Sequence, residues 1–162
     1  MSALTFILVV LVAFIAGVAS VVDERQFHRP LVACTLMGFA LGDPTTGIML
    51  GGALELIALG WMNVGAAMAP DSALASTISA VVVIQGHQDI TTGIAIAVPL
   101  AAAGQVLTIF VRTITVFFQH QADNFAKTAN FRGIELMHIS GMVLQGLRVA
   151  IPTAIVALIS SE

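Results

Sequence analysis

Charged residues are scarce in this sequence. Asp, Glu, Lys and Arg make up only 9% of the 162 residues, whereas soluble domains carry about 25%. Hydrophobic residues make up 58%, and the mean hydropathy is +1.01. This composition excludes an ordinary soluble domain and indicates an integral membrane protein.

Other scarcities exclude several kinds of site. One cysteine, Cys34, cannot form an internal disulfide or a cysteine-rich zinc site, so we expect a small buried hydrophobe. The four histidines are scattered without metal-ligand spacing. No phosphate loop, nucleophile elbow or dinucleotide fingerprint is present, so no metal or cofactor is expected. The net charge of −3 gives no indication of nucleic-acid binding.

The lengths of the apolar runs predict which of them can span a bilayer as a single helix. Residues 3–22 carry no charge and can cross the hydrocarbon core as a helix, as can residues 134–160. The run 31–42 is too short to span alone, and 90–118 exceeds one span and contains Pro99. We therefore expect an all-α integral membrane protein with several transmembrane helices, whose middle has short, broken or re-entrant helices.

A polar segment, QHQADNFAKTANFRG, occupies residues 119–133 and is expected to be a loop. Its Lys127 and Arg132 favour the cytoplasmic side of the membrane, because basic loops tend to remain there.

Two similar hexapeptides suggest a repeat. Residues 43–48 read DPTTGI, and residues 89–94 read DITTGI. Asp and Thr before an apolar run are typical of helix capping, so one interpretation is two similar helix starts. The alternative is an internal structural repeat of the kind that transporters often contain. Nearby GFALG and GIMLG fit a small-xxx-small pattern and predict close helix packing.

Glu55 is the most informative single residue. It lies within GIMLGGALELIALGWM, where an unpaired charge at the bilayer centre costs about 2.5–3.5 kcal/mol on the mildest scale. The side chain should therefore face the protein interior and find a partner. It either holds two helices together or belongs to a ligand or ion site, and we favour the site.

The segment 60–73, GWMNVGAAMAPDSA, is predicted to interrupt the helix that contains Glu55. Trp61 is interpreted either as an interfacial anchor or as a stacking wall for a ring-shaped ligand. Asn63 can donate and accept hydrogen bonds, which suits a hydroxyl-rich molecule. A break near Gly60 would allow Glu55 and Asn63 to face one pocket.

The stretch VVDERQFHRP, residues 21–30, concentrates ionisable groups after a charge-free segment. It is either a solvated surface loop or part of a hydrated cavity. Pro30 disfavours a helical conformation at the residue before it, so a helix should end at Arg29. Carboxylates, an amide and an imidazole are suited to binding a neutral polyol. The predicted substrate-binding residues are Asp23, Glu24, Gln26, His28, Glu55 and Asn63. Arg112 and Arg148 are expected to be salt-bridge partners or to lie near an interface.

Long segments of the chain resemble one family. VVDERQFHRPLVACTLMGFALGD, GALELIALGWMNVGAAMAPDSALAS, GIAIAVPLAAAGQVLTIFVRTITVFFQHQAD and LRVAIPTAIVAL are similar to the IIC membrane subunit of mannose/fructose/sorbose-family sugar phosphotransferase systems. Members of that family are longer, so residues 1–162 are expected to form a membrane-embedded permease domain that is an N-terminal part of such a subunit.

The resemblance implies a multi-pass permease of the bacterial plasma membrane that imports a hexose such as mannose or glucose. It also implies a IID membrane partner, a trimer of IIC–IID pairs with elevator-like motion, and cytoplasmic IIA and IIB components that carry phosphate on histidine. No phosphoryl-transfer residue is expected in this chain. In some bacteria such subunits also act as bacteriocin receptors.

Two alternatives differ from sugar translocation by this chain. In one, the chain is a structural membrane partner or bacteriocin receptor, and the sugar site lies mainly in IID. In the other, it is an ion-coupled transporter in which Glu55 carries a proton.

Overall fold

Helices form almost all of the protein. The computed structural model describes residues 1–22, 26–65 and 67–160. In chain order the helices are α1 (Ala3–Val22), α2 (Pro30–Leu41), α3 (Pro44–Ala58), α4 (Ser72–Gln85), α5 (Ile90–Lys127) and α6 (Phe131–Ile159). Outside these helices, the described residues contain one isolated β-bridge, between Val64 and Ala67. The all-α prediction is confirmed.

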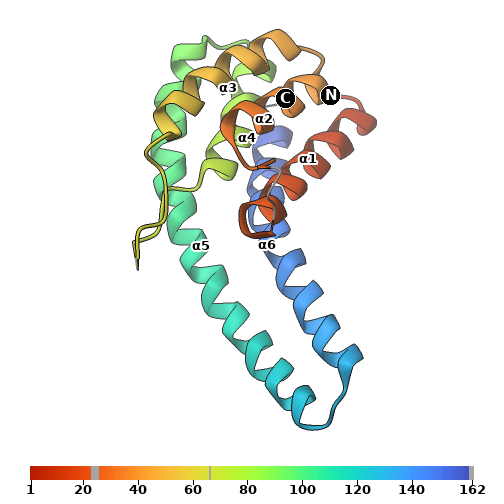
Figure 1. Cartoon of the computed structure of the whole chain (residues 1–162). Helices are drawn as coiled ribbons and strands as arrows, with labels where there is room; N and C mark the ends of the chain where they lie inside the picture. Colours follow the sequence, from red (N-terminus) through yellow and green to blue (C-terminus); the bar gives the residue numbers. More distant parts are fainter. Residues whose placement is uncertain (23–25, 66, 161–162) are drawn as a thin grey trace.

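The two longest helices, α5 and α6, determine the shape of the molecule. Their lower halves extend as two arms that join at a tip, while α1 to α4 gather around their upper halves (Figure 1). The short helix α4 lies at the centre of this upper part, and 11 of its 14 residues are buried. The core is therefore built around α4, and the arms extend away from it.

Among the residues that the structure describes, three helices are long and apolar enough to cross a membrane, namely α1, α5 and α6. The helices expected at 3–22 and 134–160 are thus present as candidate spans. Helices α2, α3 and α4 have 12, 15 and 14 residues, which is shorter than the roughly 20 residues of a spanning helix. Short helices in the middle of the chain were expected, and these three fulfil that prediction.

The structure corrects the prediction at two places. The expectation of broken helices is wrong for the run 90–118, because α5 continues as one helix of 38 residues through Pro99. Proline removes one hydrogen bond within a helix, and the long apolar segments on both sides continue the helix around it. The expected loop at 119–133 was also wrong over most of its length, because α5 includes residues up to Lys127 and α6 begins at Phe131.

The two similar hexapeptides both begin helices. Asp43 is the N-cap of α3, where its carboxylate accepts from the Thr46 amide at 3.1 Å and from the Thr46 hydroxyl at 2.5 Å. Asp89 occupies the N-cap of α5 but makes no side-chain capping bond. The predicted helix starts are confirmed, whereas an internal repeat stays a prediction.

Glycines allow α1 to cross α6 closely. A Cβ atom on Gly17 would lie 2.7 Å from the backbone oxygen of Gln145, and one on Gly146 would lie 2.4 Å from the ring of Phe14. A Cβ on Gly38 would similarly meet the Cα of Gly47 at 3.1 Å, between α2 and α3. The close packing predicted from the small residues is confirmed for this second pair.

Candidate functional site

A polar pocket opens where α4 begins, beside α5 and α6. It has a volume of about 180 Å³. Segments far apart in the sequence contribute its polar side chains, which are Ser20, His28, Asn63, Asp71, Ser72, Thr108, Arg112 and Arg148. Hydroxyl, amide, imidazole, carboxylate and guanidinium groups therefore surround one cavity in an otherwise apolar protein.

A buried ion pair between Asp71 and Arg148 forms one wall of this pocket. Their side chains are only 4% and 2% exposed. The guanidinium of Arg148 also donates to the Thr108 hydroxyl at 2.5 Å and to the Ser20 hydroxyl at 3.0 Å. Its Nε donates to Gln145 at 3.1 Å. One side chain of α6 thus joins α1, the start of α4 and α5, and several acceptors compensate its desolvation.

Asp71 is positioned by both its backbone and its side chain. Its carboxylate accepts from the Leu74 amide at 3.1 Å and caps α4, as an aspartate before an apolar run should. Its own amide donates to the carbonyl of Ala101 at 2.9 Å. A Cβ on Gly104 would approach the Asp71 Cβ to 2.6 Å. The absence of a side chain at Gly104 therefore lets α5 approach the ion pair.

The segment between α3 and α4 carries Asn63 to the pocket. The predicted break is confirmed, because α3 ends at Ala58 and α4 begins at Ser72. The segment projects beside α5 (Figure 1), where the Gln105 amide donates to the carbonyl of Met68 at 2.8 Å. Asn63 closes the segment on itself by accepting from the Ala69 amide at 2.8 Å.

Trp61 precedes this turn, is partly buried and lines the polar pocket. That position suits a stacking wall, and this role stays a prediction.

Two described residues of the charged stretch at 21–30, Val21 and His28, line the pocket. The hydroxyl of Ser72 donates to the His28 carbonyl at 3.3 Å and ties this stretch to α4. Gln26 is exposed and has a φ of +62°. The predicted site residues Asp23 and Glu24 lie outside the described residues.

The end of the first helix differs from the prediction. α1 ends at Val22, so no helix ends at Arg29. Arg29 has an extended backbone, as expected before a proline, and Pro30 begins α2.

Glu55 pairs with Arg29 and does not appear among the described residues that line the polar pocket. The Arg29 Nε donates to its carboxylate at 2.6 Å, and the Leu31 amide donates at 3.1 Å. Glu55 therefore joins α3 to the start of α2, which is the helix-linking arrangement considered for it. The structure brings His28 and Asn63 into one pocket, whereas Glu55 pairs with Arg29, the residue after His28.

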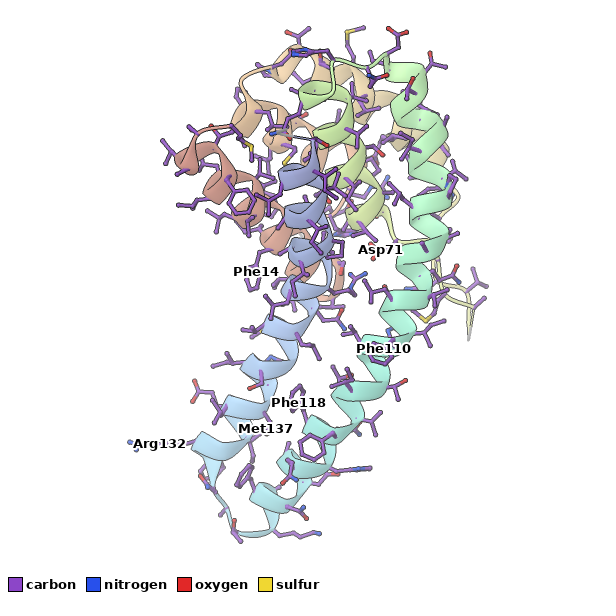
Figure 2. All side chains as sticks on the ribbon, turned by 180° about the vertical axis from the view of Figure 1, so that it is seen from behind. Phe14, Asp71, Phe110, Phe118, Arg132 and Met137 are labelled. Carbon is purple, nitrogen blue, oxygen red and sulfur yellow. The ribbon has the colours of Figure 1, made fainter. Side chains whose placement is uncertain are left out.

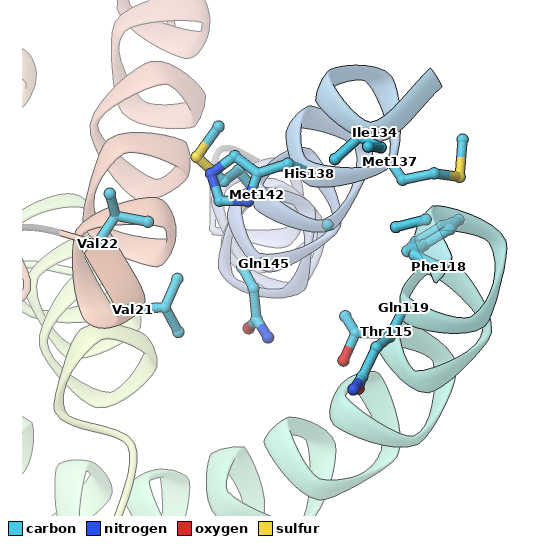
Figure 3. A pocket seen from close by; sticks show the side chains of 12 residues that line it. Val21, Val22, Thr115, Phe118, Gln119, Ile134, Met137, His138, Met142 and Gln145 are labelled. Carbon is cyan, nitrogen blue, oxygen red and sulfur yellow. The ribbon is translucent and has the colours of Figure 1, made fainter. Parts of the chain in front are cut away.

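A second, larger pocket of about 420 Å³ lies between the end of α1 and the two arms. Figure 3 shows Thr115 and Gln119 of α5 and Gln145 of α6 around this space, with Val21 on the other side. Apolar side chains such as Phe118 and Met137 form most of the rest, and both also lie between the arms in Figure 2. Val21 lines both pockets, so the two are neighbours.

Sequence reasoning missed Asp71 and Thr108 as pocket residues. An available signal was the Asp-Ser start of an apolar run, which is typical of a helix cap, but the contact with Arg148 spans 77 positions and leaves no local pattern. The prediction that Arg148 is a salt-bridge partner is confirmed. Arg112 lines the polar pocket and forms no ion pair with any residue that the structure describes. Among these same residues, no cluster of His, Cys, Asp and Glu could hold a metal ion.

The described part of the chain combines three helices that are long and apolar enough to cross a membrane with a polar pocket, which defines the class as a helical membrane protein. The family model described as the sorbose-specific IIC component of phosphotransferase systems matches residues 3–162. The chain belongs to this family.

The similar curated proteins are IIC components for several sugars. The fructose permease IIC component of Bacillus subtilis (strain 168) is 68% identical over 99% of this chain and 60% of its own length. The mannose-specific EIIC component of Escherichia coli (strain K12) is 64% identical over 96% of this chain and 58% of its own length. The chain therefore spans about three fifths of these relatives.

A solved structure has the same fold. One chain of the cryo-EM structure of the mannose transporter ManYZ with microcin E492 (MceA) matches with a TM-score of 0.96 and 61% identity. The match covers 100% of this chain and 65% of that one.

Proposed function

We propose that this chain forms the sugar-binding part of a phosphotransferase IIC permease that imports a hexose across a bacterial plasma membrane. The observation that carries the proposal is the polar pocket enclosed by apolar helices in a chain of this family. A neutral sugar loses its water shell on binding, so the site must supply many aligned hydrogen bonds. Hydroxyl, amide, imidazole and carboxylate groups in one cavity meet that requirement.

Within this proposal, His28 and Asn63 contact the sugar from the pocket wall. Asp23, Glu24 and Gln26 belong to the same stretch as His28 and contribute further hydrogen bonds. Glu55 acts through Arg29, because that ion pair fixes the residue next to His28. Asp71 and Arg148 hold the opposite wall in place. Trp61 provides an apolar face for the sugar ring.

The proposal extends to the membrane and to partners. The helices α2, α3 and α4 are re-entrant, because they are too short to span and pack against the spanning helices. The complete subunit works with a IID membrane subunit in a trimer of IIC–IID pairs. Cytoplasmic IIA and IIB components phosphorylate the sugar, with no phosphoryl-transfer residue in this chain. The preferred sugar is mannose, glucose, fructose or sorbose, since the relatives named for a sugar include mannose, fructose and sorbose.

A second candidate function is that of a bacteriocin receptor. One observation favours it, because the similar structure of ManYZ is a complex with microcin E492. This role is compatible with sugar transport. It differs from the alternative in which the chain is a structural partner and the complex binds sugar only in IID.

Sugar binding to the assembled IIC–IID complex tests the main proposal. We expect Asn63→Ala to weaken hexose affinity about 5- to 150-fold, because a lost contact that leaves a polar group unpaired costs about 1–3 kcal/mol. Asn124→Ala is the matched control, since Asn124 is exposed on α5 and its side chain accepts a hydrogen bond from Lys127, outside both pockets. Calorimetric titration in nanodiscs measures both variants. Equal hexose affinity for the parent and Asn63→Ala would place the sugar site elsewhere.

A further inference from the structure

The polar pocket contains two arginines in very different environments. Arg148 is buried, and its guanidinium is occupied by Asp71, Thr108, Ser20 and Gln145. Its charge is balanced inside the protein, so it is part of the wall. Arg112 is exposed and lines the same pocket.

Arg112 follows Thr108 by four residues, so both lie on one face of α5. Thr108 contacts the Asp71–Arg148 pair. Arg112 therefore lies one turn of α5 beyond the residue that contacts the ion pair. Among the residues that the structure describes, Asp71 pairs with Arg148, and Arg112 has no carboxylate partner.

A neutral sugar does not need this charge. An arginine in a membrane-spanning helix is costly and typically marks a substrate path or pairs with an anion. A polyol that carries an anionic group would hydrogen-bond with the polar side chains and also pair with Arg112. Guanidinium groups bind phosphoryl oxygens through two parallel hydrogen bonds, which favours a phosphate ester over a single hydroxyl.

We propose that Arg112 binds the phosphoryl group of a sugar phosphate in the polar pocket, while the hydroxyl-binding groups around Asn63 hold the sugar. This inference rests on the proposed function, in which other components phosphorylate the hexose. Arg112 takes no part in forming or breaking the ester bond. It is a binding subsite that distinguishes the phosphorylated sugar from the free one.

The polar side chains that follow Arg112 along α5 indicate a path by which the ester could leave this subsite. Thr115 and Gln119 follow on α5 at helical spacing and line the neighbouring pocket with Gln145. Figure 3 shows these three side chains around one space. Along α5, Arg112 of the polar pocket is thus followed by residues that line a second cavity, which can receive the ester when it leaves.

The test measures free hexose and hexose phosphate on the full IIC–IID complex in phosphatidylcholine nanodiscs, a bilayer without net lipid charge. Calorimetry is run with mannose and fructose and with the 1- and 6-phosphates of each. The variants are Arg112→Gln and Arg112→Lys. Arg132→Gln is the matched control, because Arg132 is exposed near the tip, far from the pocket (Figure 2).

We expect Arg112→Gln to weaken the affinity for the phosphate ester about tenfold more than the affinity for the hexose. Arg112→Lys should retain part of the ester affinity, since it keeps the charge but not the paired donors. Arg132→Gln should change neither affinity. Inorganic phosphate and glycerol 3-phosphate, the fragment of a lipid headgroup, should bind more weakly than the sugar ester.

Three outcomes would overturn the inference alone. They are equal losses for hexose and ester, an ester affinity that does not depend on Arg112, and inorganic phosphate or glycerol 3-phosphate that binds as tightly as the ester. A parent complex that binds ester but no hexose would overturn the proposed function and this inference with it.

Discussion

Arg29 and Glu55 form an ion pair that joins the start of α2 to the last turns of α3. The pair is not deeply buried, since the two side chains are 32% and 19% exposed. Arg29 follows His28, which lines the polar pocket. The carboxylate that looked isolated in the sequence thus has a cation 26 positions away, and the pair links helix packing to the position of a pocket residue.

Glu55→Gln is expected to impair sugar uptake more than membrane insertion. Glutamine retains an acceptor for the Leu31 amide but removes the charge that holds Arg29. Because the pair is partly exposed, we expect a loss of about 1 kcal/mol in unfolding free energy. The displaced His28 segment should lower hexose affinity about fivefold. Glu135→Gln, on the exposed side of α6, is the control. If Glu55→Gln takes up sugar normally at equal membrane abundance, the role of Glu55 is confined to helix packing.

Asp71→Asn should destabilise the protein strongly although asparagine caps helices as well as aspartate does. The substitution leaves Arg148 buried without its counter-charge, which costs about 3–5 kcal/mol in other proteins. Thermal unfolding of detergent-purified complex measures the loss. Arg148→Met combined with Asp71→Asn should recover part of it, because the buried charge is gone. Additive losses in this double-mutant cycle would show that the two residues do not interact.

The sequence predicts elements more readily than contacts between them. Residues 3–22 are apolar throughout, so length and composition alone located α1. The α5 helix was harder, because Pro99 and the polar residues after 118 are local signals of interruption, whereas packing against α4 and α6 favours one long helix. Asn63 and His28 were predicted from their chemistry. The Asp71–Arg148 wall depends on a tertiary contact that no local pattern encodes.

Glycines at the α1–α6 crossing should tolerate no side chain. Gly17→Ala would place a methyl group 2.7 Å from the Gln145 backbone oxygen, and backbone atoms can move only if the helices separate. We expect a loss of about 1–3 kcal/mol in unfolding free energy. Gly141→Ala is the control on α6, because a Cβ there meets nothing within 4 Å and alanine favours a helix by about 1 kcal/mol. If the melting temperature of Gly17→Ala is not lower than that of Gly141→Ala, the close α1–α6 crossing is contradicted.

Two equivalent helix starts should respond differently to loss of their aspartates. Asp43→Ala removes two bonds to Thr46, whereas Asp89→Ala removes no side-chain cap. Asp43→Ala should therefore lower the melting temperature more. The hydrogen bonds from Thr46 lower the pKa of Asp43 in the folded state. Its stabilisation is then present above the ordinary aspartate pKa and is lost as the pH falls through the lowered value. The difference between the two variants should shrink in melts at acidic pH. Equal melting temperatures at neutral pH would argue against the cap.

The charged stretch before α2 should contribute directly to sugar affinity. Two of its described residues, Val21 and His28, line the cavity that Asn63 also lines. A carboxylate there can accept from two sugar hydroxyls, and Gln26 can both donate and accept.

The variants Asp23→Asn, Glu24→Gln and Gln26→Ala, made one at a time, test this contribution. Each loss should weaken hexose affinity about 5- to 150-fold, since an unpaired polar group costs about 1–3 kcal/mol. Calorimetric titration of the assembled IIC–IID complex measures this, with Gln121→Ala on α5, outside both pockets, as the control. If all three variants bind hexose as tightly as the parent, the stretch is a surface loop and the sugar is held by the pocket wall alone.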